Sequence, residues 1–134
     1  MAIRPAFLVA EPEPQQALSV RKLVLETGKF NVITAHSTRE AVETFHLFPN
    51  VAAAILAGES EIDCDKVAST IKGATDKVPI IHLHASIGGR CVQADHHLSS
   101  HEPEALLDLV RSLFGDPREI ESAPKQPSLS LSQV

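Results

Sequence analysis

The sequence predicts an α/β fold in which a parallel β-sheet lies between two layers of helices, and two observations support this. Short apolar runs, too brief for helices, alternate with longer segments whose apolar residues recur at helical spacing. One such run lies within the stretch NVAAAILAGES at residues 50–60 and ends at Gly58, which is typical of a central strand buried on both faces. Right-handed crossovers between parallel strands then place helices on both faces of the sheet. The expected architecture is a three-layer sandwich with five parallel strands in the flavodoxin-like order 2-1-3-4-5.

The first half of the chain is predicted to hold three strands and two helices. The strands are expected at Ala6–Ala10, at Asn31–Ala35 and at residues 52–57. A helix over residues 15–27 follows the first strand, with Gly28 as its C-terminal cap. A second helix begins after Ser37 and runs to about Leu47, and Ser37 and Glu40 have the spacing of a reciprocal capping box.

The second half repeats the alternation of strands and helices. The residues Cys64, Val67, Ala68 and Ile71 form one stripe of a third helix, and Ile80–His84 is expected to be the fourth strand. Two adjacent glycines in residues 85–94 disfavour a helix there, so the fourth helix is expected to be short, mobile or missing. A fifth strand at His96–Ser99 leads to a final helix that begins at Pro103 and ends at Gly115.

The composition indicates one domain followed by a tail. At 134 residues the chain can bury a core without a staple, and we expect that domain at residues 1–115. Residues 116–134 mix prolines and serines and show no apolar period. Because such a segment buries too little apolar surface to offset its ordering entropy, we predict a disordered tail.

Charge and cysteine usage narrow the possible partners. The net charge of −5 and the lack of a basic run argue against a nucleic-acid partner. The start of the chain, interrupted by Arg4 and Pro5, resembles neither a signal peptide nor a membrane span, so we expect a cytoplasmic protein with no membrane partner. Cys64 and Cys91 have no CxxC spacing and are therefore predicted to be buried or idle thiols in a reducing cytosol.

Four segments in order carry a resemblance to a known family: FLVAEPEP, AAAILAGES, VPIIHLHAS and QADHHLSSHEPEALLDLVRSL. Together they resemble the receiver domain of two-component response regulators, and the resemblance covers residues 5–115. Receivers accept a phosphoryl group on an aspartate at the end of the third strand. They hold Mg²⁺ with an acidic pair after the first strand, and they stabilise the product with a hydroxyl residue and a lysine.

The resemblance implies that this chemistry is lost. Ala57 occupies the position of the phosphoacceptor aspartate, and Ser100 that of the lysine. The remaining site positions are also changed: Glu11 and Pro12 stand for the acidic pair, His84 for the Ser/Thr, and His101 for the proline after the lysine. Phosphoryl transfer needs an oxygen nucleophile and cations that neutralise the developing charge, which Ala57 and Ser100 do not supply. We therefore predict a degenerate receiver, with no catalytic residue and no cofactor.

The histidines allow two interpretations. His82 and His84 alternate on the fourth strand, and His97 lies on its expected neighbour, where receivers usually carry an aromatic residue. One hypothesis is a pH-sensitive or metal-sensitive switch, with metal ligands drawn from Glu11, Glu13, His84, His97 and His101. The other is that these are polar residues at the ends of strands and have no specific function. We favour the second and expect no metal, and we expect Glu11 and Glu13 to act on the start of the first helix.

Three classes of function remain. We favour a stand-alone, non-enzymatic receiver that acts in phosphorelay-type signalling as a protein-interaction module without phosphorylation. The resemblance implies a partner surface formed by the fourth helix, fifth strand and last helix, near Arg90, His97, Ser99 and Leu106. A homodimer through that face is compatible with the sequence. The alternative is a non-catalytic module that senses a ligand, a metal or pH through the His-rich crevice. An enzyme ranks last, because the chain has no glycine-rich phosphate loop and no nucleophile motif.

Overall fold

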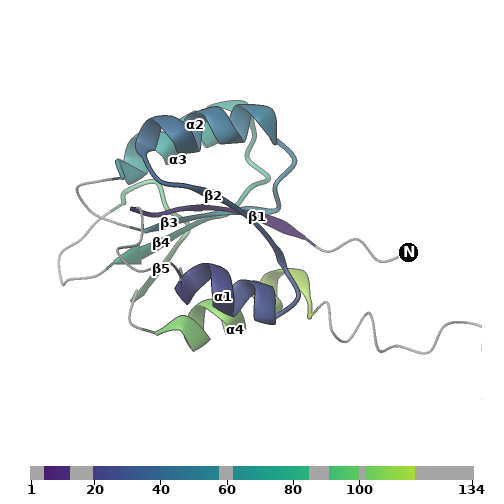
Figure 1. The fold of residues 1–134 in the computed structure, drawn as a ribbon. Helices are drawn as coiled ribbons and strands as arrows, with labels where there is room; N and C mark the ends of the chain where they lie inside the picture. The colour runs from purple at the N-terminus through teal and green to yellow at the C-terminus, as the bar shows by residue number, and fades with distance from the viewer. Residues whose placement is uncertain (1–4, 13–19, 58–61, 85–90, 100–101, 117–134) are drawn as a thin grey trace, which may run out of the picture.

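The computed structural model describes residues 5–12, 20–57, 62–84, 91–99 and 102–116 (Figure 1). Parallel strands within them form one sheet in the order β2-β1-β3-β4-β5, which confirms the predicted flavodoxin-like topology. The strand bounds match the prediction to within one residue: β1 Ala6–Ala10, β2 Asn31–Ala35, β3 Ala53–Ala57, β4 Ile80–His84 and β5 His96–Ser99.

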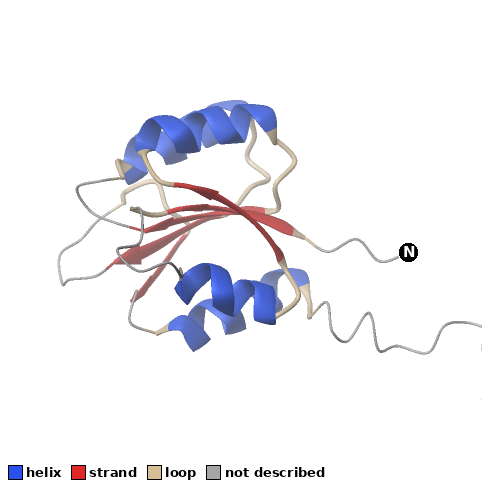
Figure 2. Cartoon of the chain, in the orientation of Figure 1, coloured by secondary structure: helices blue, strands red, loops and turns tan. Residues whose placement is uncertain are grey.

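Helices cover both faces of the sheet, as the crossover rule requires. Figures 1 and 2 show two of them, α2 and α3, on one face, and the other two, α1 and α4, on the opposite face. Their bounds are α1 Val20–Thr27, α2 Thr38–Leu47, α3 Cys64–Ala74 and α4 Pro103–Phe114. The expected first turn of α1, before residue 20, lies outside the described residues. So do residues 85–90 of the doubtful helix between β4 and β5, and residues 91–95 contain no helix.

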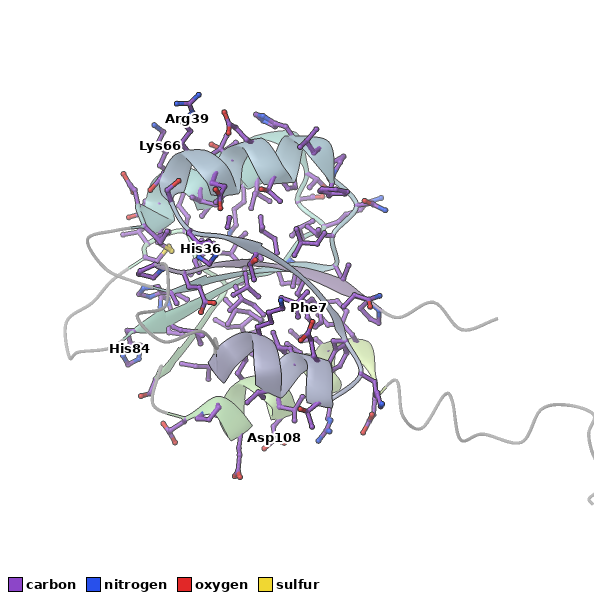
Figure 3. The ribbon with its side chains drawn as sticks, in the orientation of Figure 1. Phe7, His36, Arg39, Lys66, His84 and Asp108 are labelled. Carbon is purple, nitrogen blue, oxygen red and sulfur yellow. A yellow bond between two sulfur atoms is a disulfide. The ribbon has the colours of Figure 1, made fainter. Side chains whose placement is uncertain are left out.

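The core consists of two apolar layers, one on each face of the sheet, because side chains alternate along every strand. Leu8, Leu56 and Ile80 pack with α2 and α3, whereas Phe7 and Ile55 pack with α1 and α4. The Phe7 ring lies 5.0 Å from that of Phe30 and 5.4 Å from that of Phe114, and Figure 3 shows it pointing toward α1. All five residues of β3 are fully buried, as expected for the central strand.

Local signals at the helix ends are largely confirmed, with one change of partner. Ser37 is the N-cap of α2, and its Oγ accepts a hydrogen bond from the Glu40 N–H at 3.1 Å. The return bond of the predicted capping box goes instead from the N–H of His36 to Glu40 Oε1, at 2.7 Å. Asp63 caps α3 by accepting from the Lys66 N–H at 3.1 Å. The N–H of Glu40 in the first turn of α2, and that of Lys66 in the first turn of α3, are thus satisfied by the side chain of the N-cap residue.

Gly28 follows the end of α1, as predicted, and its N–H donates to the Val24 carbonyl at 3.0 Å. The residue with positive φ is Lys29, at 72°, which permits the Phe30 N–H to bond to the Leu25 carbonyl at 3.0 Å. Gly28 serves another purpose, since a Cβ there would lie 2.6 Å from Leu107 Cδ1 of α4. Glycine at this position therefore allows α1 and α4 to approach each other.

The prediction of free thiols is wrong, because Cys64 and Cys91 form a disulfide. The bond joins the first residue of α3 to the connection between β4 and β5, with the Cα atoms 5.6 Å apart. Cys64 is buried, as its place in the helix stripe predicted. The pairing was missed because the two residues are 27 apart in sequence and only the crossover from β3 to β4 brings them together. Separately, we find no helix with the length and apolar character to cross a bilayer among the described residues.

Candidate functional site

The carboxyl ends of the parallel strands meet at one edge of the sheet, where open α/β folds place their functional groups. At this edge β1 is followed by Glu11, and β3, β4 and β5 end at Ala57, His84 and Ser99. The register pairs Ala57 with Leu83 and His84 with Ser99. Figure 3 shows His84 at this edge of the sheet. The described site residues of the sequence prediction are thus brought to one edge.

Ala57 is the decisive residue of this edge. Its side chain is fully buried in the apolar layer that contains Val9, Ile55 and Leu83. A methyl group can neither attack a phosphorus atom nor coordinate a cation. At the position that the resemblance gives to the phosphoacceptor, the chain therefore continues its hydrophobic core.

Glu11 supplies a carboxylate next to this position but is held by its backbone to β2. Its N–H donates to the Ala35 carbonyl at 2.9 Å, and its own carbonyl lies 3.2 Å from His36 Nδ1. The residue is 2% exposed. The neighbouring Pro12 has no side-chain oxygen. The expected action of Glu13 on the start of the first helix lies outside the described residues.

These residues do not fit the Mg²⁺ ion that the fold implies. Magnesium prefers octahedral oxygen ligands and is usually held by one or two carboxylates together with waters and phosphates. Of the acidic pair that the resemblance assigns to Mg²⁺, Pro12 presents no side-chain oxygen and only Glu11 retains a carboxylate, and Ala57 at the phosphoacceptor position adds no side-chain oxygen. Over the part of the chain that the structure describes, no group of three or more His, Cys, Asp and Glu side chains is arranged to hold a metal ion.

Three imidazoles gather on β4 and β5, on the face of the sheet that carries Leu56 and not on the face that carries Ala57. His82 pairs with His97 across β4 and β5, and their ring centroids are 5.6 Å apart in an edge-to-face arrangement. His84 follows on the same face of β4, with its ring 6.2 Å from that of His82. His82 is 1% exposed, whereas His97 is exposed. The alternation of β4 predicted that His82 and His84 share a face, and the register adds His97 to them.

His82 belongs to a row that crosses the entire sheet. The paired positions in this row are Ala35, Ala10, Leu56, His82 and His97. The first three are fully buried and apolar, so the row changes from methyl and isobutyl groups to imidazoles between β3 and β4. Sequence reasoning could not rank His82 above the other histidines, because only the register shows that it lies between His97 and the core.

Asp95 fixes the start of β5. Its Oδ2 accepts from the Ile80 N–H at 2.8 Å, its Oδ1 accepts from Lys72 Nζ at 3.0 Å, and its own N–H donates to the Ile80 carbonyl at 2.8 Å. Burial raises the pKa of Asp95, but the hydrogen bonds from Ile80 and Lys72 outweigh that effect and hold the pKa below its usual value. The sequence prediction missed this residue, although its place directly before a strand was visible.

The surface next to the end of β5 is acidic. Glu104 and Asp108 are exposed on α4, and together with Glu102, Pro103 and Ala105 they line a shallow, open hollow. Leu106, expected near the partner surface, is 1% exposed and holds α4 on the sheet, so its side chain contributes no surface. Ser99 is half-buried at the end of β5. Four other predicted positions, Glu13, Arg90, Ser100 and His101, lie outside the described residues.

Comparison with known proteins supports the fold directly. No family model matches the chain, and no curated protein matches it. Among solved structures, a response regulator receiver domain protein from Clostridium thermocellum is 18% identical, with a TM-score of 0.69 over 87% of this chain and 98% of that one. The chain has the fold of a receiver domain.

Two further receiver structures were determined with the ligands that this chain does not fit. The response regulator TrrA from Thermotoga maritima, in complex with Mg(2+)-BeF, is 26% identical, with a TM-score of 0.67 over 82% of this chain and 99% of that one. The receiver domain of a sensor histidine kinase from Pseudomonas aeruginosa, with a magnesium ion in its active-site cleft, is 19% identical, with a TM-score of 0.69 over 82% of this chain and 97% of that one. The receiver fold is retained here with Ala57 at the end of β3.

Proposed function

We propose that this receiver-fold protein acts in two-component-type signal transduction as a non-enzymatic interaction module that does not use phosphorylation. The observation that carries the proposal is the buried methyl group of Ala57, which continues the apolar core where receivers accept a phosphoryl group. The misfit of Mg²⁺ at Glu11 and Pro12 supports it, because phosphoryl transfer depends on positioned cations. Signalling then proceeds by contact with a protein partner, in the cytoplasm, where two-component receivers work.

Treatment with acetyl phosphate and Mg²⁺, followed by intact-mass measurement, tests the first part of this proposal. We expect no mass increase in the native protein. We also expect none in Ala57→Asp, because the position of the lysine is held by Ser100 and one metal carboxylate is replaced by Pro12. A receiver with the complete set of site residues serves as the positive control. Labelling of the native chain that is lost on hydroxylamine treatment would overturn the proposal.

The proposed partner surface is the exposed side of β5 and α4. It contains His97 and Ser99 on β5, which share the face of the sheet that carries Leu56, and the carboxylates of Glu104 and Asp108 on α4, which covers the opposite face. The surface therefore extends around the border strand β5. Its acidic character fits a partner that presents lysine or arginine, because complementary charge speeds encounter and fixes orientation. Figure 3 shows Asp108 pointing into solvent from α4, on the opposite side of the molecule from Arg39.

Charge reversal distinguishes this surface from the rest of the molecule. With a partner captured by the full chain, we expect Glu104→Lys combined with Asp108→Lys to weaken binding at least tenfold. Arg39→Glu is the matched control, because Arg39 is 87% exposed on α2, on the other face of the sheet. We expect this control to bind as the native protein does, and a phosphodonor to change neither affinity. Equal loss in both variants would contradict a surface on β5 and α4.

One alternative is a non-catalytic module that senses pH or a small ligand. The cluster of three imidazole side chains, from His82, His84 and His97, favours it. Partner affinity measured between pH 5.5 and 8, compared with that of His97→Gln, tests this alternative directly. A pH dependence that the variant removes would support the sensing function. An affinity that is constant over this range would support the contact function alone.

A further inference from the structure

The disulfide between Cys64 and Cys91 ties the start of α3 to the connection that leads into β5 (yellow in Figure 3). Cys64 is 6% exposed and Cys91 is 0% exposed, so the bond lies just beneath the surface. Both residues also pack in the apolar layer between the sheet and α2 and α3. The bond is therefore a covalent link between α3 and the segment that leads into β5, on the face of the sheet that α2 and α3 cover.

We propose that Cys64 and Cys91 form a reversible thiol–disulfide switch that controls whether the β4–β5 connection is held on α3. The proposal rests on the cytoplasmic location proposed above. In a compartment kept reducing by glutathione and thioredoxin, disulfides are rare, and those that occur are mostly transient and redox-sensing. A disulfide in a cytoplasmic receiver fold is thus expected to open and close rather than to act as a permanent staple.

The reaction is thiol–disulfide exchange with a dithiol reductant. A thiolate of the reductant attacks Cys64 Sγ, because Cys91 has no exposed surface, and the Cys64–Cys91 bond breaks as a mixed disulfide forms. Cys91 leaves as a thiolate and takes up a proton. The second thiol of the reductant then attacks the reductant sulfur that is bonded to Cys64. This step closes the disulfide of the reductant and releases Cys64 as a thiolate, which takes up a proton. In sum, the protein gains two electrons and two protons, and the reductant becomes a disulfide. Oxidised glutathione can reverse the reaction by the same exchange.

Other contacts limit what reduction releases. The Gln93 N–H donates to Asp65 Oδ1 of α3 at 3.2 Å, and Asp95 bonds to Lys72 of α3 and to Ile80 of β4. These bonds hold residues 93–95 without the disulfide, so β5 remains paired in the sheet. Reduction therefore releases the covalent link between Cys91 and the start of α3, while the core stays folded.

A thiol-trapping titration of the purified full chain tests the chemistry. The native protein is equilibrated with mixtures of reduced and oxidised dithiothreitol, quenched with acid, labelled with a maleimide mass tag and weighed intact. We expect one reversible transition in which two tags appear together, and reoxidation by oxidised glutathione. If the native protein takes up no tag in excess reduced dithiothreitol, while the guanidinium-unfolded protein takes up two, the bond is a permanent staple and the proposal is overturned.

Hydrogen exchange locates the structural change. In the reduced protein we expect at least tenfold faster deuterium uptake in peptides that contain Cys91, and unchanged uptake in β1 and β3. The variants Cys91→Ser and Cys64→Ser should reproduce this pattern, and the reduced native protein provides the same comparison if either variant fails to fold. Faster uptake throughout the sheet, or no change at Cys91, would contradict a local switch.

The same acid quench and maleimide labelling, applied to living cells, tests the proposed cytoplasmic location on which the switch depends. We expect a mixture of tagged and untagged protein whose ratio shifts on brief treatment with diamide or dithiothreitol. A protein that stays fully oxidised in cells under both treatments would overturn the switch. None of these measurements needs a partner or a phosphodonor. The switch can therefore fail while the interaction surface on β5 and α4 stands, and the reverse also holds.

Discussion

Strands β3 and β5 end at the same edge of the sheet but are held there by different forces. Every residue of β3 is fully buried between the two helix layers, so apolar burial on both faces fixes it. In β5, at the border of the sheet, no residue is fully buried, and Asp95 anchors its start through hydrogen bonds to Ile80 and Lys72. The central strand is thus positioned by non-directional burial, and the outer one by directional polar contacts.

This difference extends to the side chains at that edge. At the end of β3, the methyl group of Ala57 extends the apolar layer, which favours folding. At β4 and β5 the imidazoles of His82 and His97 lie on the same row as Leu56, and polar groups there need hydrogen-bond partners when they are buried. The end of β3 is therefore apolar, while β4 and β5 carry polar side chains at the same edge.

The largest effect is expected from Leu56→Ala in β3. Leu56 is fully buried, so the truncation leaves a cavity and lowers the free energy of unfolding by about 3 to 4 kcal/mol, independent of pH. Urea denaturation followed by circular dichroism measures this change. Leu47→Ala is the matched control, because Leu47 is 75% exposed, and its effect should stay within about 0.5 kcal/mol. Similar losses in the two variants would contradict the claim that apolar burial holds β3 in place.

Ala57→Asp is expected to have the next largest effect. A carboxylate would replace a fully buried methyl group in this apolar layer, so we expect a loss of about 2 to 3 kcal/mol at pH 7. Burial raises the pKa of the new carboxyl in the folded state. Its destabilisation therefore grows as the pH rises through that pKa, and it is relieved below the pKa of the unfolded chain. Denaturation of this variant and of Ala57→Asn at pH 7 and pH 4 separates charge from size, because only the aspartate variant should recover in acid.

Asp95→Asn tests how much the charge of Asp95 contributes to holding β5 in place. The asparagine oxygen can still accept from the Ile80 N–H, but the charge pair with Lys72 is lost. That carboxylate is 40% exposed, so screening limits the loss to about 0.5 kcal/mol at pH 7. Because the folded-state pKa of Asp95 lies below 3.8, its stabilisation is present above that pH and is lost as the pH falls through the folded value. The difference in stability between native protein and variant should thus shrink as the pH falls below 3.8, whereas an undiminished difference in acid would contradict a charge effect.

The smallest effect on stability is expected from His97→Ala. His97 is exposed on β5 and contacts His82 through its ring edge, so its removal should change the free energy of unfolding by no more than about 0.5 kcal/mol. Thermal denaturation of the native protein and of the variant measures this change in the free energy of unfolding. If the proposed partner surface is correct, the same variant should weaken partner binding. A large loss of stability would instead make His97 a structural residue.

Much of the fold was visible in the sequence because its signals are local. The sequence predicted β4 and β5 to the residue, and Ser37 and Gly115 marked helix ends because caps involve neighbours in the chain. The candidate site was predictable only in part. The ends of β3 and β4 place Ala57 and His84 at one edge, but the ring contacts of His82 depend on strand register, and the anchoring by Asp95 depends on α3.

By itself, the sequence determined which segments form strands and helices and which residue stands at the end of β3, since periodicity and residue identity are properties of the chain alone. Only the tertiary structure decided which distant residues meet. It paired Cys64 with Cys91, placed Leu107 against Gly28, and set His97 beside His82. The physical reason is that these contacts depend on the crossovers and the register of the sheet, which bring together residues that no local pattern relates.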